Sequence, residues 1–284
     1  MFDRSEDNPP VPAFLRWVLA IECSVVFVAG VLLFFLPGLA SSLWAWTVPP
    51  FNSRFVGAVY LAAYLPLLLF WFVPRWIPGR LTLWMILTFT TLILIGMLVH
   101  WDAFEWSRPA TFLVYWPLYI FLPINSAIFL YRSNSGGVAN GYDGPALLRT
   151  ILLIFAVLSG AYGLGLLVAP EPLTSFWPWD VDAFHARMYA AAFLTPAVAA
   201  WILSFRRRFA SEYLSMGLNL VAGGFLPVFG TLWTSLSLPA ERQVNFNSTG
   251  TWIFFGFFFL TGILGIMLVN EAVQLAKNPR AVRS

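Results

Sequence analysis

The residue whose type and position most suggest chemistry in this chain is Glu22. It lies about eight residues into the apolar run 14–36, which is about 12 Å along a helix. A carboxylate inside a membrane costs several kcal/mol unless it is paired, protonated or exposed to water. Glu22 therefore predicts a proton- or cation-coupling site or a substrate anchor, with the polar Asn125 and Asn219 as further members of a buried network. The alternative is a protonated acid that hydrogen-bonds a neighbouring helix.

Imidazole and carboxylate side chains gather in two loops that we expect on one side of the membrane. They are His100 and Asp102 after the third apolar run, and Asp180, Asp182 and His185 between the fifth and sixth. Such groups suit zinc, manganese or iron, so a divalent metal is one hypothesis, although their spacing matches no metal signature. The alternative is an acidic, solvated rim, and no other cofactor is predicted.

A third set of residues occurs twice. Its first copy is Trp44, Trp46, Val48, Phe51 and Arg54, and its second copy is Trp177, Trp179, Val181, Phe184 and Arg187. Indole rings prefer the headgroup layer, so the Trp pairs predict an interfacial belt. The two arginines, Arg54 and Arg187, precede apolar runs. They predict contacts with anions or lipid headgroups, for which the guanidinium fork is suited, beside a simpler anchoring role.

The two copies belong to a longer duplication. A shift of 133 positions aligns residues 15–64 with 148–197, and 15 of these 50 positions are identical. The alignment breaks where ionisable side chains stand, since Glu22 falls on Phe155 and His185 falls on Asn52. A site built from this repeat is therefore expected to be asymmetric.

Composition points to a membrane protein. The chain is 60% hydrophobic and 10% charged, whereas soluble domains carry about 25% charged residues. We therefore expect the lipid bilayer as a partner, and the absence of a long basic run argues against nucleic acid. The single cysteine, Cys23, excludes an intramolecular disulfide and a cysteine-based zinc site. No phosphate-binding loop of the GxxxxGK[ST] type is present.

Eight apolar runs are each close to the length that crosses a bilayer as a helix. They are 14–36, 55–73, 81–99, 111–131, 147–169, 188–205, 214–238 and 251–269. The predicted fold is an all-α integral membrane protein of eight transmembrane helices. Its parts are a polar tail 1–13, a four-helix repeat 14–132, a linker 133–146, a second four-helix repeat 147–270 and a C-tail 271–284. Four spans per repeat predict parallel halves, related by a pseudo-two-fold axis along the membrane normal.

Basic residues predict the orientation. Twelve fall in the N-terminus, the linkers after the second, fourth and sixth runs and the C-tail, while four fall in the other loops. Because cytoplasmic loops carry the excess of Lys and Arg, both termini are expected in the cytoplasm of a multi-pass cell-membrane protein. Fifteen arginines to one lysine indicate a GC-rich bacterial genome.

Three functions are compatible with these features. The first is a transporter or channel-like protein for a small molecule or ion, with a cavity that involves Glu22 and helices kinked at prolines such as Pro66 and Pro196. The second is a non-catalytic subunit of a larger membrane complex that holds lipid or a cofactor. The third is a metal-dependent membrane enzyme that acts on lipid. We favour the first because of the parallel repeat, Glu22 and the kinked spans, whereas the 18% aromatic content, the short loops and the missing catalytic constellation favour the second.

Overall fold

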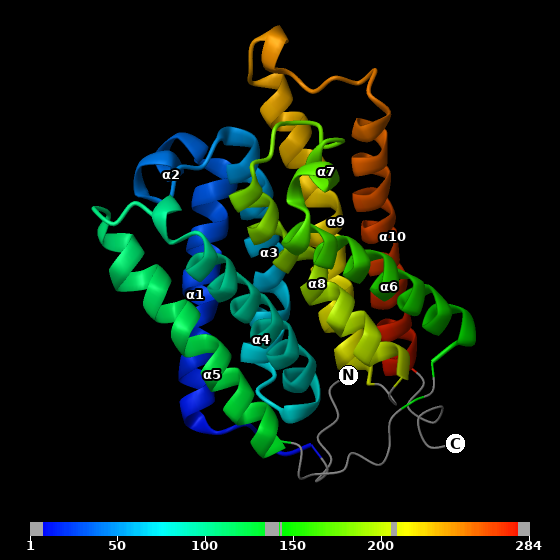
Figure 1. Ribbon diagram of the computed structural model, residues 1–284. Coiled ribbons are helices and arrows are strands. Elements are labelled where there is room, and N and C mark those ends of the chain that lie inside the picture. Colours follow the sequence, from blue (N-terminus) through cyan, green and yellow to red (C-terminus); the bar gives the residue numbers. More distant parts are fainter. Residues whose placement is uncertain (1–7, 134–141, 143, 206–208, 278–284) are drawn as a thin grey trace.

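The protein is an all-helical bundle in a computed structural model that describes residues 8–133, 142, 144–205 and 209–277 (Figure 1). Within these described residues, eight helices are long and apolar enough to cross a membrane, which confirms the predicted number. They are α1 (Ala13–Phe35), α3 (Pro50–Phe72), α4 (Trp76–Val99), α5 (Trp116–Ser133), α6 (Ala146–Val168), α8 (Ala183–Phe205), α9 (Ala210–Leu236) and α10 (Thr249–Lys277). A π-helical stretch, η2 (Thr111–Tyr115), leads into α5.

Short elements connect these spans. They are α2 (Pro37–Leu43), α7 (Pro170–Thr174), η1 (Trp101–Ala103) and η3 (Ala240–Arg242). In Figure 1, α2 and α7 lie at one end of the bundle, which we call the α2/α7 end, while α1 begins and α10 finishes at the other. The orientation prediction rests in part on basic residues in 1–7, 206–208 and 278–284, and these lie outside the described residues, as does most of the linker 133–146.

Helices α3, α4, α8 and α9 begin four or five residues earlier than the apolar runs predict, and two of these shifts matter for the site. Helix α3 starts at Pro50 and not at position 55, and α8 starts at Ala183 and not at 188. Proline suits the first helical position because it has no N–H to leave unpaired. Arg54, His185 and Arg187 therefore belong to the first turns of long helices rather than to loops.

The two halves of the chain, 14–132 and 147–270, pack against each other through their helices. Helix α1 packs along α3 and α6 packs along α8, while α4 packs on α5 and α9 packs on α10. Contacts between the halves join α3 to α9 and α4 to α8. The helices α3, α4, α8 and α9 therefore form the interface between the halves.

Glycines allow the closest helix contact, between α9 and α10. A Cβ atom added at Gly224 would lie 2.3 Å from the backbone nitrogen of Gly262, and one added at Gly265 would lie 2.5 Å from that of Val221. Small residues let helix backbones approach in this way inside a membrane. By contrast, a Cβ at Gly256 of α10 would meet nothing within 4 Å.

We expect Gly224→Ala to push α9 and α10 apart and to lower stability by about 1–3 kcal/mol, the usual cost of overpacking. Gly256→Ala is the matched control, and it should be neutral or slightly stabilising because alanine favours helix. Thermal unfolding in detergent measures both. Equal melting temperatures for the two variants would contradict this packing.

Candidate functional site

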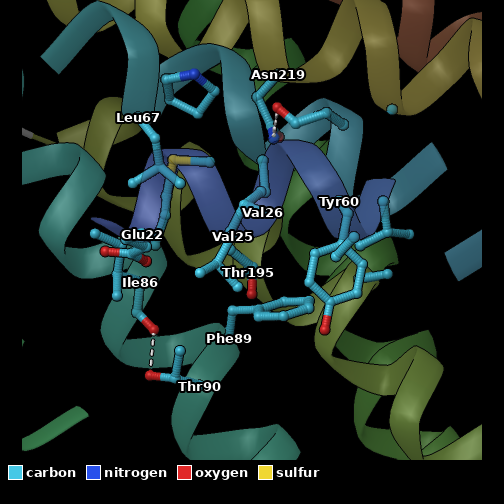
Figure 2. Close-up of a pocket in the computed structure, with 18 of the residues that line it drawn as sticks. Glu22, Val25, Val26, Tyr60, Leu67, Ile86, Phe89, Thr90, Thr195 and Asn219 are labelled. Carbon is cyan, nitrogen blue, oxygen red and sulfur yellow. Dashed lines mark hydrogen bonds between the residues drawn. The ribbon is translucent and has the colours of Figure 1, made fainter. Parts of the chain in front are cut away.

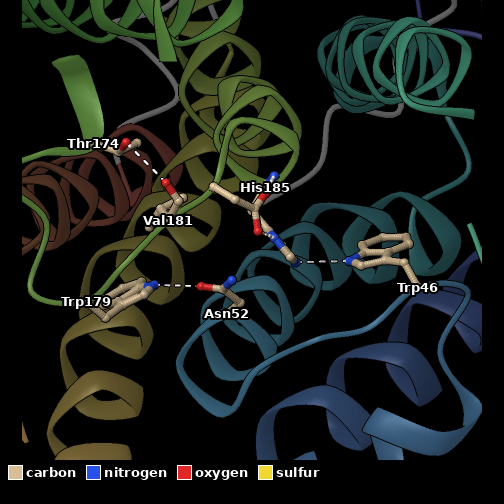
Figure 3. Close-up of polar contacts among 7 residues, drawn as sticks. Trp46, Asn52, Thr174, Trp179, Val181 and His185 are labelled. Atoms are coloured by element: carbon tan, nitrogen blue, oxygen red, sulfur yellow. Dashed lines mark hydrogen bonds and ion pairs between the residues drawn. The ribbon is translucent and has the colours of Figure 1, made fainter. Parts of the chain in front are cut away.

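Two hydrogen bonds join the halves at the α2/α7 end (Figure 3). Trp46 Nε1 donates to His185 Nε2 at 3.2 Å, and Trp179 Nε1 donates to Asn52 Oδ1 at 2.6 Å. The shift of 133 positions that aligns the repeats carries Trp46 onto Trp179 and Asn52 onto His185. The two bonds are therefore reciprocal: each half supplies one indole donor and one acceptor on a long helix.

Ring contacts follow the same rule. Trp46 packs edge-on against Phe184 with centroids 5.4 Å apart, and Trp179 stacks on Phe51 at 5.3 Å. The aligned positions Thr82 and Ser215 also meet, with their hydroxyl oxygens 3.3 Å apart. A residue meets its own aligned position in this way where two similar halves face each other around an axis.

The tryptophans do not form the interfacial belt that the sequence suggested. Trp44, Trp46 and Trp177 are buried and Trp179 is half-buried. Their rings fill the space where the loops after α2 and α7 cross the other helices. That interpretation was wrong because the preference of an indole ring for the headgroup layer says at what depth the ring lies. It does not say whether the ring contacts lipid or is buried against other helices of the protein.

The carboxylate of Asp182 positions the imidazole of His185. Asp182 Oδ1 accepts the backbone N–H of His185 at 2.8 Å, as an N-cap of α8 does, and Oδ2 lies 2.7 Å from His185 Nδ1. Partial burial opposes ionisation of Asp182, but the bonds from His185 outweigh it and lower the pKa of this carboxyl to about 2. The carboxylate holds the proton on Nδ1, which leaves Nε2 to accept from Trp46.

The two repeated arginines bind inside the protein. Buried Arg54 donates to Thr234 Oγ1 at 2.9 Å, and its guanidinium lies 4.5 Å from the ring centroid of Trp233. Arg187 approaches His100 Nε2 at 3.0 Å. Burial and the neighbouring Arg187 lower the pKa of His100, although Asp182 acts in the opposite direction. Anion or headgroup contacts of these arginines stay a prediction.

The structure does not gather the predicted metal ligands. Among the described residues, no group of three or more His, Cys, Asp or Glu side chains is placed to hold a metal ion. Both ring nitrogens of His185 already have partners, and a cationic guanidinium lies beside His100. Asp102 and Asp180 are exposed. The metal hypothesis therefore gains no support from the geometry.

A cavity of about 490 Å³ lies between the halves, and Glu22 lines it. Its walls come from α1, α3, α4, α8, α9 and neighbouring helices, and they are almost entirely apolar. Several lining positions are aligned pairs under the repeat, such as Glu22 with Phe155 and Ala62 with Thr195. The cavity is thus built from corresponding places in two halves that carry different side chains.

Glu22 is buried, with 5% of its surface exposed, and it has neither a hydrogen bond nor an ion pair among the described residues. Figure 2 draws it together with the apolar side chains of Val25, Leu67 and Ile86. Asn219 lines the same cavity, whereas Asn125 is buried outside it. The predicted network of Glu22, Asn125 and Asn219 therefore reduces to two residues that share one cavity.

Asn219 has a defined structural role. Pro66, inside α3, lacks the N–H that would bond to the carbonyl of Ala62. Asn219 Nδ2 from α9 donates to that carbonyl at 3.1 Å (Figure 2). Pro196 likewise deprives the carbonyl of Ala192 of its helical donor in α8. Both prolines line the cavity.

Further polar groups of the cavity wall gave no sequence signal. Tyr60 and Tyr119 pair through their hydroxyl oxygens at 2.6 Å. Among the described residues, Thr195 Oγ1 and Trp44 Nε1 are buried without a hydrogen-bond partner. The alignment places Thr195 where the first half has Ala62. The cavity thus has few polar atoms in an apolar surround, which is typical of small-molecule sites.

The chain has no significant match among protein-family models, curated proteins or solved structures.

We expect Trp46→Phe and Trp179→Phe to destabilise the protein by similar amounts, about 0.5–1.5 kcal/mol each, because each removes one hydrogen bond between the halves. Trp201→Phe is the matched control, since Trp201 is 51% exposed, and it should change stability by less than about 0.5 kcal/mol. Thermal unfolding in detergent compares the three. If both buried variants melt like the control, these bonds do not hold the halves together.

Proposed function

We propose that this protein is a membrane transporter or channel-like protein for a small molecule that occupies the cavity beside Glu22. The observation that carries the proposal is a cavity of about 490 Å³ that reaches a buried, unpaired carboxyl group inside a membrane-spanning helix. Intramembrane acids are usually functional, since an acid without a role would cost stability.

The lining favours a small molecule over a hydrated ion. Cavities of roughly 300–1,000 Å³ commonly hold drug-sized ligands. An inorganic cation needs several oxygen ligands, and an apolar cavity stays dry rather than filling with water. The few polar atoms here serve better to orient an organic ligand than to replace a hydration shell.

The two prolines support movement of the walls. Pro66 and Pro196 interrupt α3 and α8, which lie on opposite halves and both line the cavity. Proline kinks a helix and weakens its hydrogen bonding at one point. A bend at these two places would widen or narrow the cavity while the ends of each helix keep their packing.

The same proposal includes the architecture. The reciprocal bonds of Trp46 and Trp179 support two parallel four-helix halves around a pseudo-two-fold axis along the membrane normal. The excess of basic residues in the N-terminus, in the linkers after the second, fourth and sixth apolar runs and in the C-tail supports cytoplasmic termini in a bacterial cell membrane.

Cysteine labelling tests the orientation. Cys23 is buried and is the single cysteine, so Cys23→Ala gives a clean background. In intact cells, a membrane-impermeant maleimide should label Gln243→Cys at the α2/α7 end and should not label Lys277→Cys at the end of α10. The reverse pattern would place the termini outside.

Cavity occupancy tests the function. Val26→Trp puts a bulky ring on the cavity wall, and Leu147→Trp makes the same change at a position that is 70% exposed and outside the cavity. We expect a small molecule to co-purify with wild type and with Leu147→Trp. The amount bound per protein should be lower by about tenfold or more in Val26→Trp, because the indole ring occupies the space of the ligand. Mass spectrometry of denatured preparations measures this.

The same molecule should leave proteoliposomes faster with wild type than with Val26→Trp. Identical bound molecules in all three proteins would contradict a cavity ligand. A molecule that binds in the cavity but shows no protein-dependent flux would instead favour a ligand-holding subunit of a larger membrane complex.

A further inference from the structure

We infer that the ligand of this cavity is a hydrophobic organic cation, and that it reaches the cavity sideways from the bilayer through a gap lined by α1, α2 and η2. This inference rests on the proposed function and adds the chemical class of the ligand and its route. Four features of the cavity lead to it.

The first feature is the charge of the wall. Among the described residues, Glu22 supplies a carboxyl group without an internal partner, and no Lys, Arg or His side chain lines the cavity. Thr195 also lines the cavity, but its Oγ1 atom is buried behind the surface. A cation would complement the carboxyl group of Glu22, whereas an anion would find no basic group on the wall.

The second feature is the aromatic content of the wall. Rings line the cavity on several helices: Trp44, Tyr60, Phe89, Tyr115, Tyr119 and Phe257. The face of an aromatic ring attracts a cation, and the attraction is stronger where water is excluded. Aromatic cages of this kind bind quaternary ammonium groups. The rings therefore favour a cation whose charge is spread over, or surrounded by, carbon.

The third feature is that the rest of the wall is apolar. A small inorganic cation would lose its hydration shell and find one carboxyl group in return, which is too few ligands. A cation with a large apolar body loses little hydration, and it gains burial of that body as well as a counter-charge. The combination of one acid, many rings and aliphatic side chains fits such a molecule best.

The fourth feature is the position of the opening. Among the lining residues, those that are exposed on the surface belong to α1, α2 or η2: Ser24, Val28, Leu43 and Val114. Helices α1 and α5 pack together near the start of α1, where Phe14 stacks on Phe129 at 6.3 Å, so the opening lies nearer the α2/α7 end, among these exposed residues. On the other half, Phe155 stacks on Phe257 at 6.4 Å, and none of the lining residues there is exposed. Val28, Leu43 and Val114 are apolar and face outward, where lipid covers a membrane-spanning bundle.

Probes of one shape and different charge test the class of ligand. Binding of radiolabelled tetraphenylphosphonium and of the smaller methyltriphenylphosphonium is measured by equilibrium dialysis of the purified protein in detergent. Neutral triphenylphosphine and anionic tetraphenylborate serve as competitors. We expect both cations to bind wild type and tetraphenylborate to compete at least about tenfold more weakly, because it would lie beside the Glu22 carboxylate.

Variants then locate the counter-charge. Glu22→Gln keeps the size of the side chain and should weaken cation binding by about tenfold or more while leaving triphenylphosphine binding unchanged. Glu22→Asp keeps the charge and should retain most of the affinity. Glu271→Gln removes an acid of α10 that does not line the cavity, so it should bind the cations like wild type. Melting temperatures confirm that each variant is folded.

The route has its own measurement. Val114→Trp at the gap should slow association of tetraphenylphosphonium several-fold in nanodiscs, whereas Leu147→Trp, exposed on the other half, should not change it. Equal rates for the two variants would overturn lateral access.

Three results would overturn the cation class: equal affinity for tetraphenylborate, unchanged cation binding by Glu22→Gln, or no binding of either cation to wild type. Failure of the class differs visibly from failure of the proposed function. If triphenylphosphine binds wild type and is excluded by Val26→Trp regardless of charge at position 22, the cavity still binds small molecules and only the cation class is wrong. If no co-purified molecule or probe depends on Val26, the cavity function itself fails.

Discussion

The structure depends on one constraint: a polar group inside an apolar bundle has to find its partner within the protein. The long helices are joined by such pairs. Ser53 of α3 donates to the Leu33 carbonyl of α1, and Ser159 of α6 donates to the Phe193 carbonyl of α8. The indoles of Trp46 and Trp179 join the halves by the same principle. Against this background Glu22 stands out as an acid inside a membrane-spanning helix, because its carboxyl group faces a cavity and has no partner among the described residues.

Sequence reasoning recovers the parts of this architecture that depend on one helix at a time. Eight apolar runs become eight helices because each span in lipid has to satisfy its own backbone. The starts of α3 and α8 were placed too late, because Asn52, Arg54 and His185 lower the hydropathy of the first turns although these turns are helical. Glu22 lines a cavity, and its part in binding stays a prediction. The pairing of Trp46 with His185 was not predicted, since it depends on how two distant segments meet.

The proposed duplication explains why the matching contacts are similar in place and different in chemistry. An amide oxygen at Asn52 and an imidazole nitrogen at His185 each accept from an indole, so the scaffold survives the exchange of one acceptor for the other. The same freedom acts on the cavity wall, where one half carries the acid Glu22 and the other carries Phe155 stacked on Phe257. Two halves with similar packing can thus carry different side chains on the cavity wall: the first half carries the acid, and the second carries a closed aromatic surface.

The hydrogen bond from Asn219 to the Ala62 carbonyl has a mechanical consequence. The carbonyl that Pro66 leaves without its helical donor is held by a neighbouring helix, so the bend in α3 and the position of α9 are set together. Moving α9 away from α3 would leave the Ala62 carbonyl without a hydrogen-bond donor in apolar surroundings, at a cost of about 1–3 kcal/mol. Helices α3 and α9 are therefore expected to move together at this level of the bundle. A bend at Pro66 that widens or narrows the cavity therefore has to move α9 together with α3.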